Sequence, residues 1–127
     1  MSDNKIGTMA WLDLSVGNAE NVKSFYEDVI GWKSESVSMG DYDDYAMLEP
    51  INGEAVSGIC HAQGVNKDLP PAWLPYFLVV DIEASIAAVQ AKGGALVTEV
   101  KSMGSDKYAV IKDPAGAACA IYQKIAK

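Results

Sequence analysis

Hydrophobic and polar residues alternate along residues 9–16, MAWLDLSV, and this is the pattern of a β-strand with one buried face. Leu12, Leu14 and Val16 fall on one face, and Trp11 and Asp13 on the other. From residue 18 the period changes, because apolar residues now recur every three or four positions, as in an amphipathic helix. These residues are Val22, Phe25, Tyr26, Val29 and Ile30. Asn18 is suited to cap this helix and Gly31 to end it.

The remaining pattern predicts a second copy of the same unit. Residues 32–40, 44–50 and 54–62 are expected strands, and a further strand follows at 73–80. Asp81 is suited to cap a helix whose apolar side carries Ile82, Ile86 and Val89, with Gly93 and Gly94 ending it. Strands are expected at 95–100, 107–113 and 117–125. Each half therefore has the order β-α-β-β-β.

Short sequence matches between the halves support a duplication. Tyr45-Ala46 and Tyr108-Ala109 lie 63 residues apart, and Gly53 and Gly116 have the same offset. We expect one domain over residues 1–127, with module one at about 5–65, a linker at about 64–72 (GVNKDLPPA) and module two at about 73–125. A half of about 60 residues would bury only roughly 60% of its unfolded surface, so the modules should fold against each other.

Charge and cysteine content narrow the classes of partner. The net charge is −7 and no Lys/Arg cluster is present, which argues against nucleic acid and anionic membranes as partners. Neutral or cationic small molecules remain possible partners. No run of about 18 apolar residues occurs, and the first residues lack the layout of a signal peptide. Cys60 and Cys119 have no metal-binding spacing, so a cytoplasmic protein with reduced thiols is expected.

Three sequence features together resemble the vicinal oxygen chelate superfamily, which includes glyoxalase I, bleomycin-resistance proteins and extradiol dioxygenases. They are FYEDVIGW after the first strand and cap, DPAG before the last strand, and the paired βαβββ modules. The resemblance covers about Met9 to Gln123, and residues 60–77 further resemble a glyoxalase-like bacterial subgroup. It implies an α+β fold with a curved mixed sheet enclosing a cleft and helices on the convex face. We expect the helices to pack through Leu12, Leu14, Val16 and Phe25 in module one, and Phe77, Val79, Ile82 and Ile86 in module two.

The resemblance also implies where a divalent metal would be held, namely by the first and last strands of each module. Those positions carry Trp11, Leu74, Ala120 and Ser57. Indole, isobutyl and methyl groups provide no metal ligand, and a serine hydroxyl is a poor one. A register shift of two residues would substitute Asp13, Tyr76, Tyr122 and Ile59, which is still a weak set. We therefore expect no metal and no other cofactor.

Side chains at and beside these positions form the predicted ligand-binding face: Trp11, Asp13, Ser57, His61, Tyr76 and Tyr122. An aromatic surface with a few polar groups is typical of small-molecule sites. Asp13 and His61 are the candidate catalytic residues, since a strand-face carboxylate and an imidazole suit acid–base chemistry. The alternatives are structural: Trp11 in the core or an interface, the tyrosines as covering groups, Asp13 at a solvated rim, and His61 as a surface residue.

Three functions are compatible with this pattern. The first is a metal-free small-molecule binder, resembling the bleomycin-resistance branch. The second is a lactoylglutathione-lyase-like lyase or isomerase acting on a small carbonyl compound. The third is a non-catalytic interaction module. A homodimer is expected in each case, because each half leaves sheet edges and an aromatic face that a partner would cover, and closed two-fold dimers are the commonest oligomers.

Overall fold

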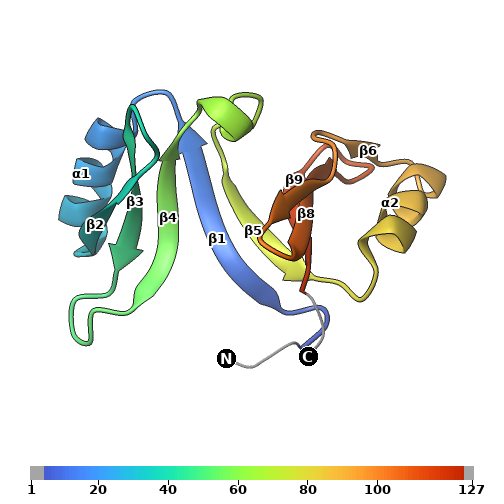
Figure 1. The fold of residues 1–127 in the computed structure, drawn as a ribbon, viewed down its shortest axis with the longest axis horizontal. Coiled ribbons are helices and arrows are strands. Elements are labelled where there is room, and N and C mark those ends of the chain that lie inside the picture. The colour runs from blue at the N-terminus through green and yellow to red at the C-terminus, as the bar shows by residue number, and fades with distance from the viewer. Residues whose placement is uncertain (1–4, 125–127) are drawn as a thin grey trace. The chain divides into compact units, whose positions relative to one another are not determined.

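The computed structural model describes residues 5–124 (Figure 1). In the first half, strand β1 is followed by helix α1 and strands β2, β3 and β4; their bounds are Met9–Val16, Ala19–Ile30, Lys33–Ser38, Asp43–Leu48 and Ala55–His61. A short 3-10 helix, η1 (Gly64–Asn66), lies in the linker. The second half contains β5, α2, β6, β7, β8 and β9, which span Trp73–Leu78, Ile82–Ala91, Ala95–Leu96, Lys101–Met103, Asp106–Lys112 and Ala118–Gln123. The predicted α+β class is confirmed.

The two modules have the same strand topology, as the internal repeat predicted. In module one the strand order is β2-β3-β4-β1, with β1 parallel to β4 and the other pairs antiparallel. In module two β5 is parallel to β9, β8 is antiparallel to β9, and the short strands β6 and β7 both pair with β8. Together β6 and β7 occupy the place that β2 has in module one.

In module one, α1 packs on one face of the strands (Figure 1). Leu14, Met47 and Ile59 form a buried cluster with Ala19 of the helix, and Val16 packs against it. The indole Nε1–H of Trp73 donates to the Tyr26 hydroxyl at 3.1 Å, on the same side. The start of α1 is capped as predicted, because Asn18 Oδ1 accepts from the Asn21 N–H at 3.4 Å. Gly31 has φ of +92° and its N–H donates to Glu27, so a residue without Cβ is favoured there.

The predicted apolar stripe of α1 is too wide. Val22 and Tyr26 pack against the core, whereas Phe25, Val29 and Ile30 are 57%, 62% and 52% exposed. The five apolar residues cover a wide arc, because successive helical residues are about 100° apart, and the sheet contacts the side of that arc that carries Val22 and Tyr26. The expectation that Phe25 anchors the helix is therefore wrong.

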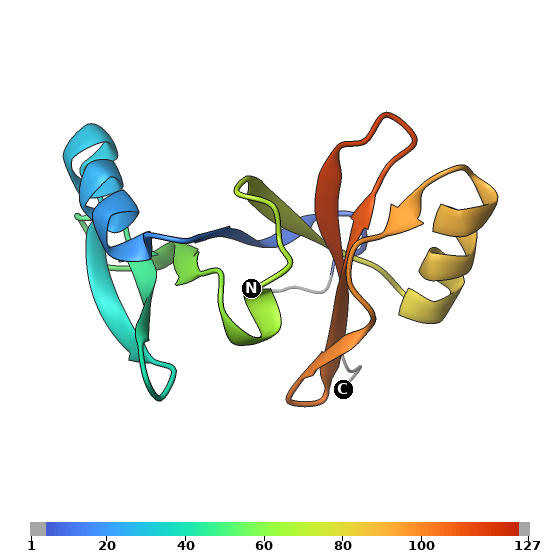
Figure 2. The ribbon, with the colours of Figure 1, turned by 90° about the horizontal axis from the view of Figure 1, so that it is seen from above.

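In module two, α2 packs on one side of β8 and β9 (Figure 2). Ile82 is buried in a cluster with Ala109 and Ile121, and Val79 and Ile86 pack against this cluster. Of the four residues expected to pack the helix of module two, Val79, Ile82 and Ile86 therefore do so. Asp81 caps the helix, since its Oδ1 accepts from the N–H groups of Glu83 (3.1 Å) and Ala84 (3.4 Å). The Ile82 N–H donates to Gln123 Oε1 at 2.8 Å, which ties the start of α2 to the last strand.

The chain divides into two compact units whose boundary differs from the predicted module boundary. One unit is Leu12–Trp73; the other combines the residues up to Trp11 with those from Leu74 onward. The start of the chain joins module two through backbone bonds, because the Gly7 N–H donates to the Leu78 carbonyl (2.8 Å) and the Leu78 N–H donates to the Thr8 carbonyl (3.0 Å). Among the described residues, no helix is both long and apolar enough to span a membrane.

Candidate functional site

Three tyrosines lie together on the face of module two that is turned away from α2. Strand pairing places Tyr76 beside Ala120 and Tyr108 beside Tyr122, whereas the α2 side carries Ala109 and Ile121. The ring centroids are 5.9 Å apart for Tyr76–Tyr108, 6.5 Å for Tyr76–Tyr122 and 6.4 Å for Tyr108–Tyr122. These three rings are called the tyrosine face below. The structure thus brings the predicted Tyr76 and Tyr122 together.

Sequence reasoning missed Tyr108, the third member of the tyrosine face. It stands directly opposite Tyr122 in the β8–β9 hairpin. The signal was available: counting equal steps outward from the turn at residues 113–117 pairs these two residues, and directly paired residues share one face of a sheet. Tyr108 is 7% exposed and Tyr76 5%, while Tyr122 is the more accessible ring.

A carboxylate completes the tyrosine face. The Tyr122 hydroxyl donates to Asp106 Oδ2 at 2.7 Å and lies 3.7 Å from the sulfur of Met103. Burial, followed by the hydrogen bond and the negative charge of Asp106, raises the pKa of Tyr122 to about 12. At neutral pH the Tyr122 phenol is therefore neutral, and Asp106 stands beside it, while Lys101 pairs with Tyr108 across β7 and β8.

In module one the structure separates residues that the sequence interpretation had placed on one face. Asp13 pairs with Gly58, whereas Leu14 pairs with Ile59 and Val16 with His61. Ser57 and His61 share the parity of Ile59 and so lie on the α1 side, opposite Asp13. Ser57 is fully buried, and its hydroxyl has no hydrogen-bond partner among the described residues. The expectation that Asp13, Ser57 and His61 share one face is wrong.

The cause is the register between the first and last strands of each module. Beyond the bulge between Met47 and Leu48, the hairpin pairs of module one match those of module two at the 63-residue offset. The parallel pairs differ by one residue, because Asp13 pairs with Gly58 whereas Tyr76 pairs with Ala120, and a one-residue shift reverses the face. Gly58, not Ser57, is the residue whose side of the sheet matches Ala120.

Cys60 lies on the Asp13 side, beside Ser15, and is a poor nucleophile. Its thiol pKa is raised by burial and then by the negative charges of Asp13 and Asp44, which keep the thiol protonated. Trp11 is half-buried and shares the strand face of Asp13. Cys119 also has a raised thiol pKa, mainly from burial.

The residues present do not fit a divalent metal. Leu74 and Ala120 are buried and carry no donor atom, and the Ser57 hydroxyl faces the α1 core. Within residues 5–124, no group of three or more His, Cys, Asp or Glu side chains is arranged to hold an ion. Divalent sites normally need about three protein ligands, so no step of chemistry is assigned to a metal here.

Comparison with known proteins agrees with this fold. Residues 8–121 match the family model of the Glyoxalase/Bleomycin resistance protein/Dioxygenase superfamily. "Putative glyoxylase CFP32" of Mycobacterium tuberculosis is 29% identical over 124 residues, which are 96% of this chain and 48% of that protein. "Anthracycline biosynthesis protein DnrV" of Streptomyces peucetius is 29% identical over 131 residues, with coverages of 93% and 47%. The chain thus spans about half the length of the curated relatives it matches.

Solved structures give the same result at lower identity. A superfamily member from Vibrio splendidus 12B01 has a TM-score of 0.58 at 20% identity and covers 92% of this chain and 100% of its own. Methylmalonyl-CoA epimerase from Mycobacterium tuberculosis has a TM-score of 0.58 at 14% identity, with coverages of 99% and 94%. With a family model matched over most of its length, this chain belongs to the Glyoxalase/Bleomycin resistance protein/Dioxygenase superfamily.

Proposed function

We propose that this protein binds a small planar molecule, apolar or cationic, on the tyrosine face without a divalent metal. The observation that carries the proposal is the gathering of Tyr76, Tyr108 and Tyr122 within 6.5 Å of one another on the side away from α2, with Tyr122 as the accessible ring over two buried ones. Aromatic rings attract planar ligands through offset or edge-to-face contacts, and cations through the negative ring face. Such binding needs shape and charge, and no reactive group.

The ring faces and the net charge of the chain favour cations over anions. The whole chain carries −7, while at the tyrosine face Asp106 accepts from the Tyr122 hydroxyl and Lys101 stands opposite Tyr108 in the β7–β8 pair, so this face carries a group of each sign. A cation would gain from the ring faces and from the overall negative field, which an anionic ligand would meet. The printed names of the relatives, which refer to a glyoxylase and to anthracycline biosynthesis, are consistent with a small molecule as the ligand.

The test is a titration with two aromatic dyes, ethidium as the cation and 8-anilinonaphthalene-1-sulfonate as the anion. Binding is measured by dye fluorescence and by the shift of the melting temperature. Ethidium should bind and raise the melting temperature equally with and without EDTA. Tyr122→Leu should weaken ethidium binding about twofold to tenfold, since one aromatic contact contributes about 0.5–1.5 kcal/mol beyond its area. Tyr122→Phe, which keeps the ring, should bind like the parent protein.

Tyr45→Leu is the matched control, because Tyr45 belongs to module one and packs on the α1 side. Equal weakening by Tyr45→Leu and Tyr122→Leu, or stronger binding of the anionic dye, would contradict the proposal. Elemental analysis of protein purified without chelator should find no stoichiometric zinc, nickel, manganese or iron. A metal found at one equivalent, together with binding abolished by EDTA, would also contradict it.

A second candidate is a glyoxalase-like lyase or isomerase acting on a small carbonyl compound. It is favoured by the printed name of the mycobacterial relatives and by the single histidine, His61, which has a carboxylate beside its ring. An assay with methylglyoxal and glutathione, run in EDTA, tests this candidate. Turnover lost in His61→Ala but kept in Tyr122→Leu would favour it over the binder. If neither dye binding nor turnover is detected, the third function, a non-catalytic interaction module, becomes the favoured one.

A further inference from the structure

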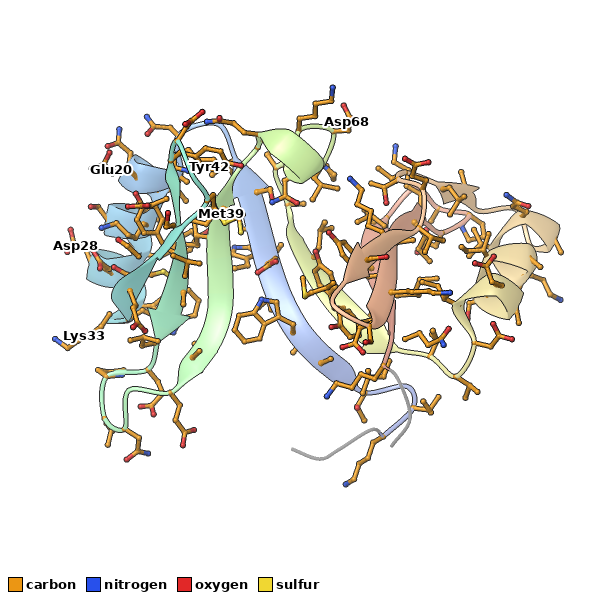
Figure 3. All side chains as sticks on the ribbon, in the orientation of Figure 1. Glu20, Asp28, Lys33, Met39, Tyr42 and Asp68 are labelled. Carbon is orange, nitrogen blue, oxygen red and sulfur yellow. The ribbon has the colours of Figure 1, made fainter. Side chains whose placement is uncertain are left out.

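His61 ends strand β4 in module one and is the only histidine of the chain. Two tyrosine rings lie beside its imidazole: the Tyr42 centroid is 5.4 Å away in an edge-on arrangement, and the Tyr45 centroid is 6.2 Å away. Figure 3 shows Tyr42 at the tip of the hairpin that joins β2 and β3, with Glu20 at the same end of this module. The imidazole is therefore held by packed rings as well as by its strand.

Asp44 is a buried carboxylate directed at this residue. It is 6% exposed, and its Oδ1 accepts a hydrogen bond from the backbone N–H of His61 at 2.8 Å. The same oxygen lies 3.5 Å from Nδ1 of the imidazole. Burial of an ionised carboxylate is costly unless donors surround it, and the His61 backbone N–H and the Cys60 thiol are donors to Asp44. The sequence analysis did not include Asp44 among the candidate site residues.

The carboxylate beside the ring favours one of the two positions of the proton in the neutral imidazole. Nδ1 is buried, and no hydrogen bond of standard geometry reaches it among the described residues. An ionised carboxylate only accepts, so a lone pair on Nδ1 would be repelled by the negative oxygen nearby, whereas an Nδ1–H would be attracted to it. The 3.5 Å separation is long for a hydrogen bond, and a modest rotation of the ring would shorten it. The proton on Nδ1 leaves the lone pair on Nε2.

The side chain of His61 is 17% exposed although Nδ1 is buried, so its accessible surface belongs to its other atoms. Asp13 and Asp44 act electrostatically on the neighbouring Cys60, and Glu20, Asp43 and Asp44 act on Tyr45. The nearby cation is Lys23, whose Nζ lies 5.0 Å from the centre of the Tyr45 ring. Acidic groups thus outnumber basic ones here, which disfavours anionic ligands.

We propose that Asp44 is a positioning residue that holds His61 in its Nδ1–H form, so that Nε2 is a proton acceptor for a small neutral or cationic molecule carrying an O–H, N–H or activated C–H. A carboxylate that orients an imidazole in this way is a general means of preparing a histidine base. The site lies in module one and does not depend on ligand binding by the tyrosine face.

The first test is nitrogen NMR of the imidazole, which reports a single residue because the chain has one histidine. At a pH where the ring is neutral, Nδ1 should show the shift of a protonated ring nitrogen and Nε2 that of an unprotonated one. Asp44→Asn removes the charge but keeps an oxygen for the His61 N–H, and it should move the protonated fraction toward Nε2. Asp43→Asn is the matched control, since Asp43 is exposed and adjacent. A proton on Nε2 in the parent protein, or identical spectra for the parent and Asp44→Asn, would overturn the proposal.

The second test measures the reactivity of Nε2 with diethyl pyrocarbonate, which acylates an unprotonated ring nitrogen and releases carbon dioxide and ethanol. Mass spectrometry at His61 should show about tenfold slower modification in Asp44→Asn than in the parent, because the charge-assisted contact that favours the reactive form is lost. Asp43→Asn should react at the parental rate. Equal rates for the parent and Asp44→Asn, with both proteins folded by circular dichroism, would refute the role of Asp44.

Discussion

Burial of Tyr122, together with the hydrogen bond from its hydroxyl to Asp106, makes stability depend on alkaline pH. Folded Tyr122 has a pKa of about 12, whereas an unfolded tyrosine ionises near pH 10. Above about pH 10 the unfolded state therefore binds fewer protons than the folded state, so the contribution of Tyr122 is present below that pH and is lost as pH rises toward 12.

Tyr122→Phe tests this dependence at the residue scale. The free energy of unfolding of the parent protein should fall more steeply than that of the variant between about pH 10 and 12, as measured by urea denaturation. Tyr45, Cys60 and Cys119 also have raised pKa values, but both proteins share them, so the difference isolates Tyr122. Parallel curves would show that the contact with Asp106 does not hold the proton.

Ile59 and Ile51 are a matched pair for testing the core of module one. Ile59 is fully buried against Leu14 and Met47, while Ile51 is 89% exposed in the turn after β3. Ile59→Ala should lower the free energy of unfolding by about 2–5 kcal/mol, because it removes buried methyl groups and leaves a cavity. Ile51→Ala should change it by less than about 0.5 kcal/mol. Similar losses in both variants would place the core elsewhere.

At the scale of elements, the caps were predictable from sequence and the buried faces only in part. Asn18 and Asp81 cap α1 and α2 as expected, because capping depends on a side chain and the backbone two or three residues away. The inward side of α1 depends on the sheet beneath it. Its apolar residues cover more of the circumference than the sheet can bury, and Phe25 is left exposed.

Asp81→Ala should destabilise the protein by about 1 kcal/mol, since the N–H groups of Glu83 and Ala84 lose their acceptor. Asp28→Ala is the control, because Asp28 is exposed near the end of α1 (Figure 3). This substitution removes the same charge as Asp81→Ala. Its effect should stay within about 0.5 kcal/mol. Thermal or urea unfolding of both variants provides the comparison, and equal effects would argue that Asp81 contributes only its charge.

At the scale of the whole molecule, we expect a homodimer. The exposed row Phe25, Val29 and Ile30 on α1 adds an apolar surface to the sheet edges that a partner would cover. Light scattering at micromolar concentration should give about twice the chain mass of 13.5 kDa. A mass of one chain across the concentration range would rule the dimer out.

The sequence by itself determined the kinds of elements, their order and their duplication. Period-two and helical patterns act over a few residues, and the Tyr-Ala and Gly matches between halves need no structure to be seen. These local signals were sufficient to predict the α+β class, both helix caps and the family. Tyr76 and Tyr122 were also placed on one face correctly, because Tyr76 pairs with Ala120, two residues before Tyr122 on the same strand.

Only the tertiary structure decided which side chains meet. The pairing of Asp13 with Gly58, one residue out of step with that of Tyr76 with Ala120, put Ser57 and His61 on the α1 side, and strand pairing brought Tyr108 to Tyr122. The contact of Asp44 with His61 joins residues 17 positions apart at the ends of neighbouring strands. Each of these depends on the alignment of one strand against another, and a single extra residue reverses every side chain beyond it.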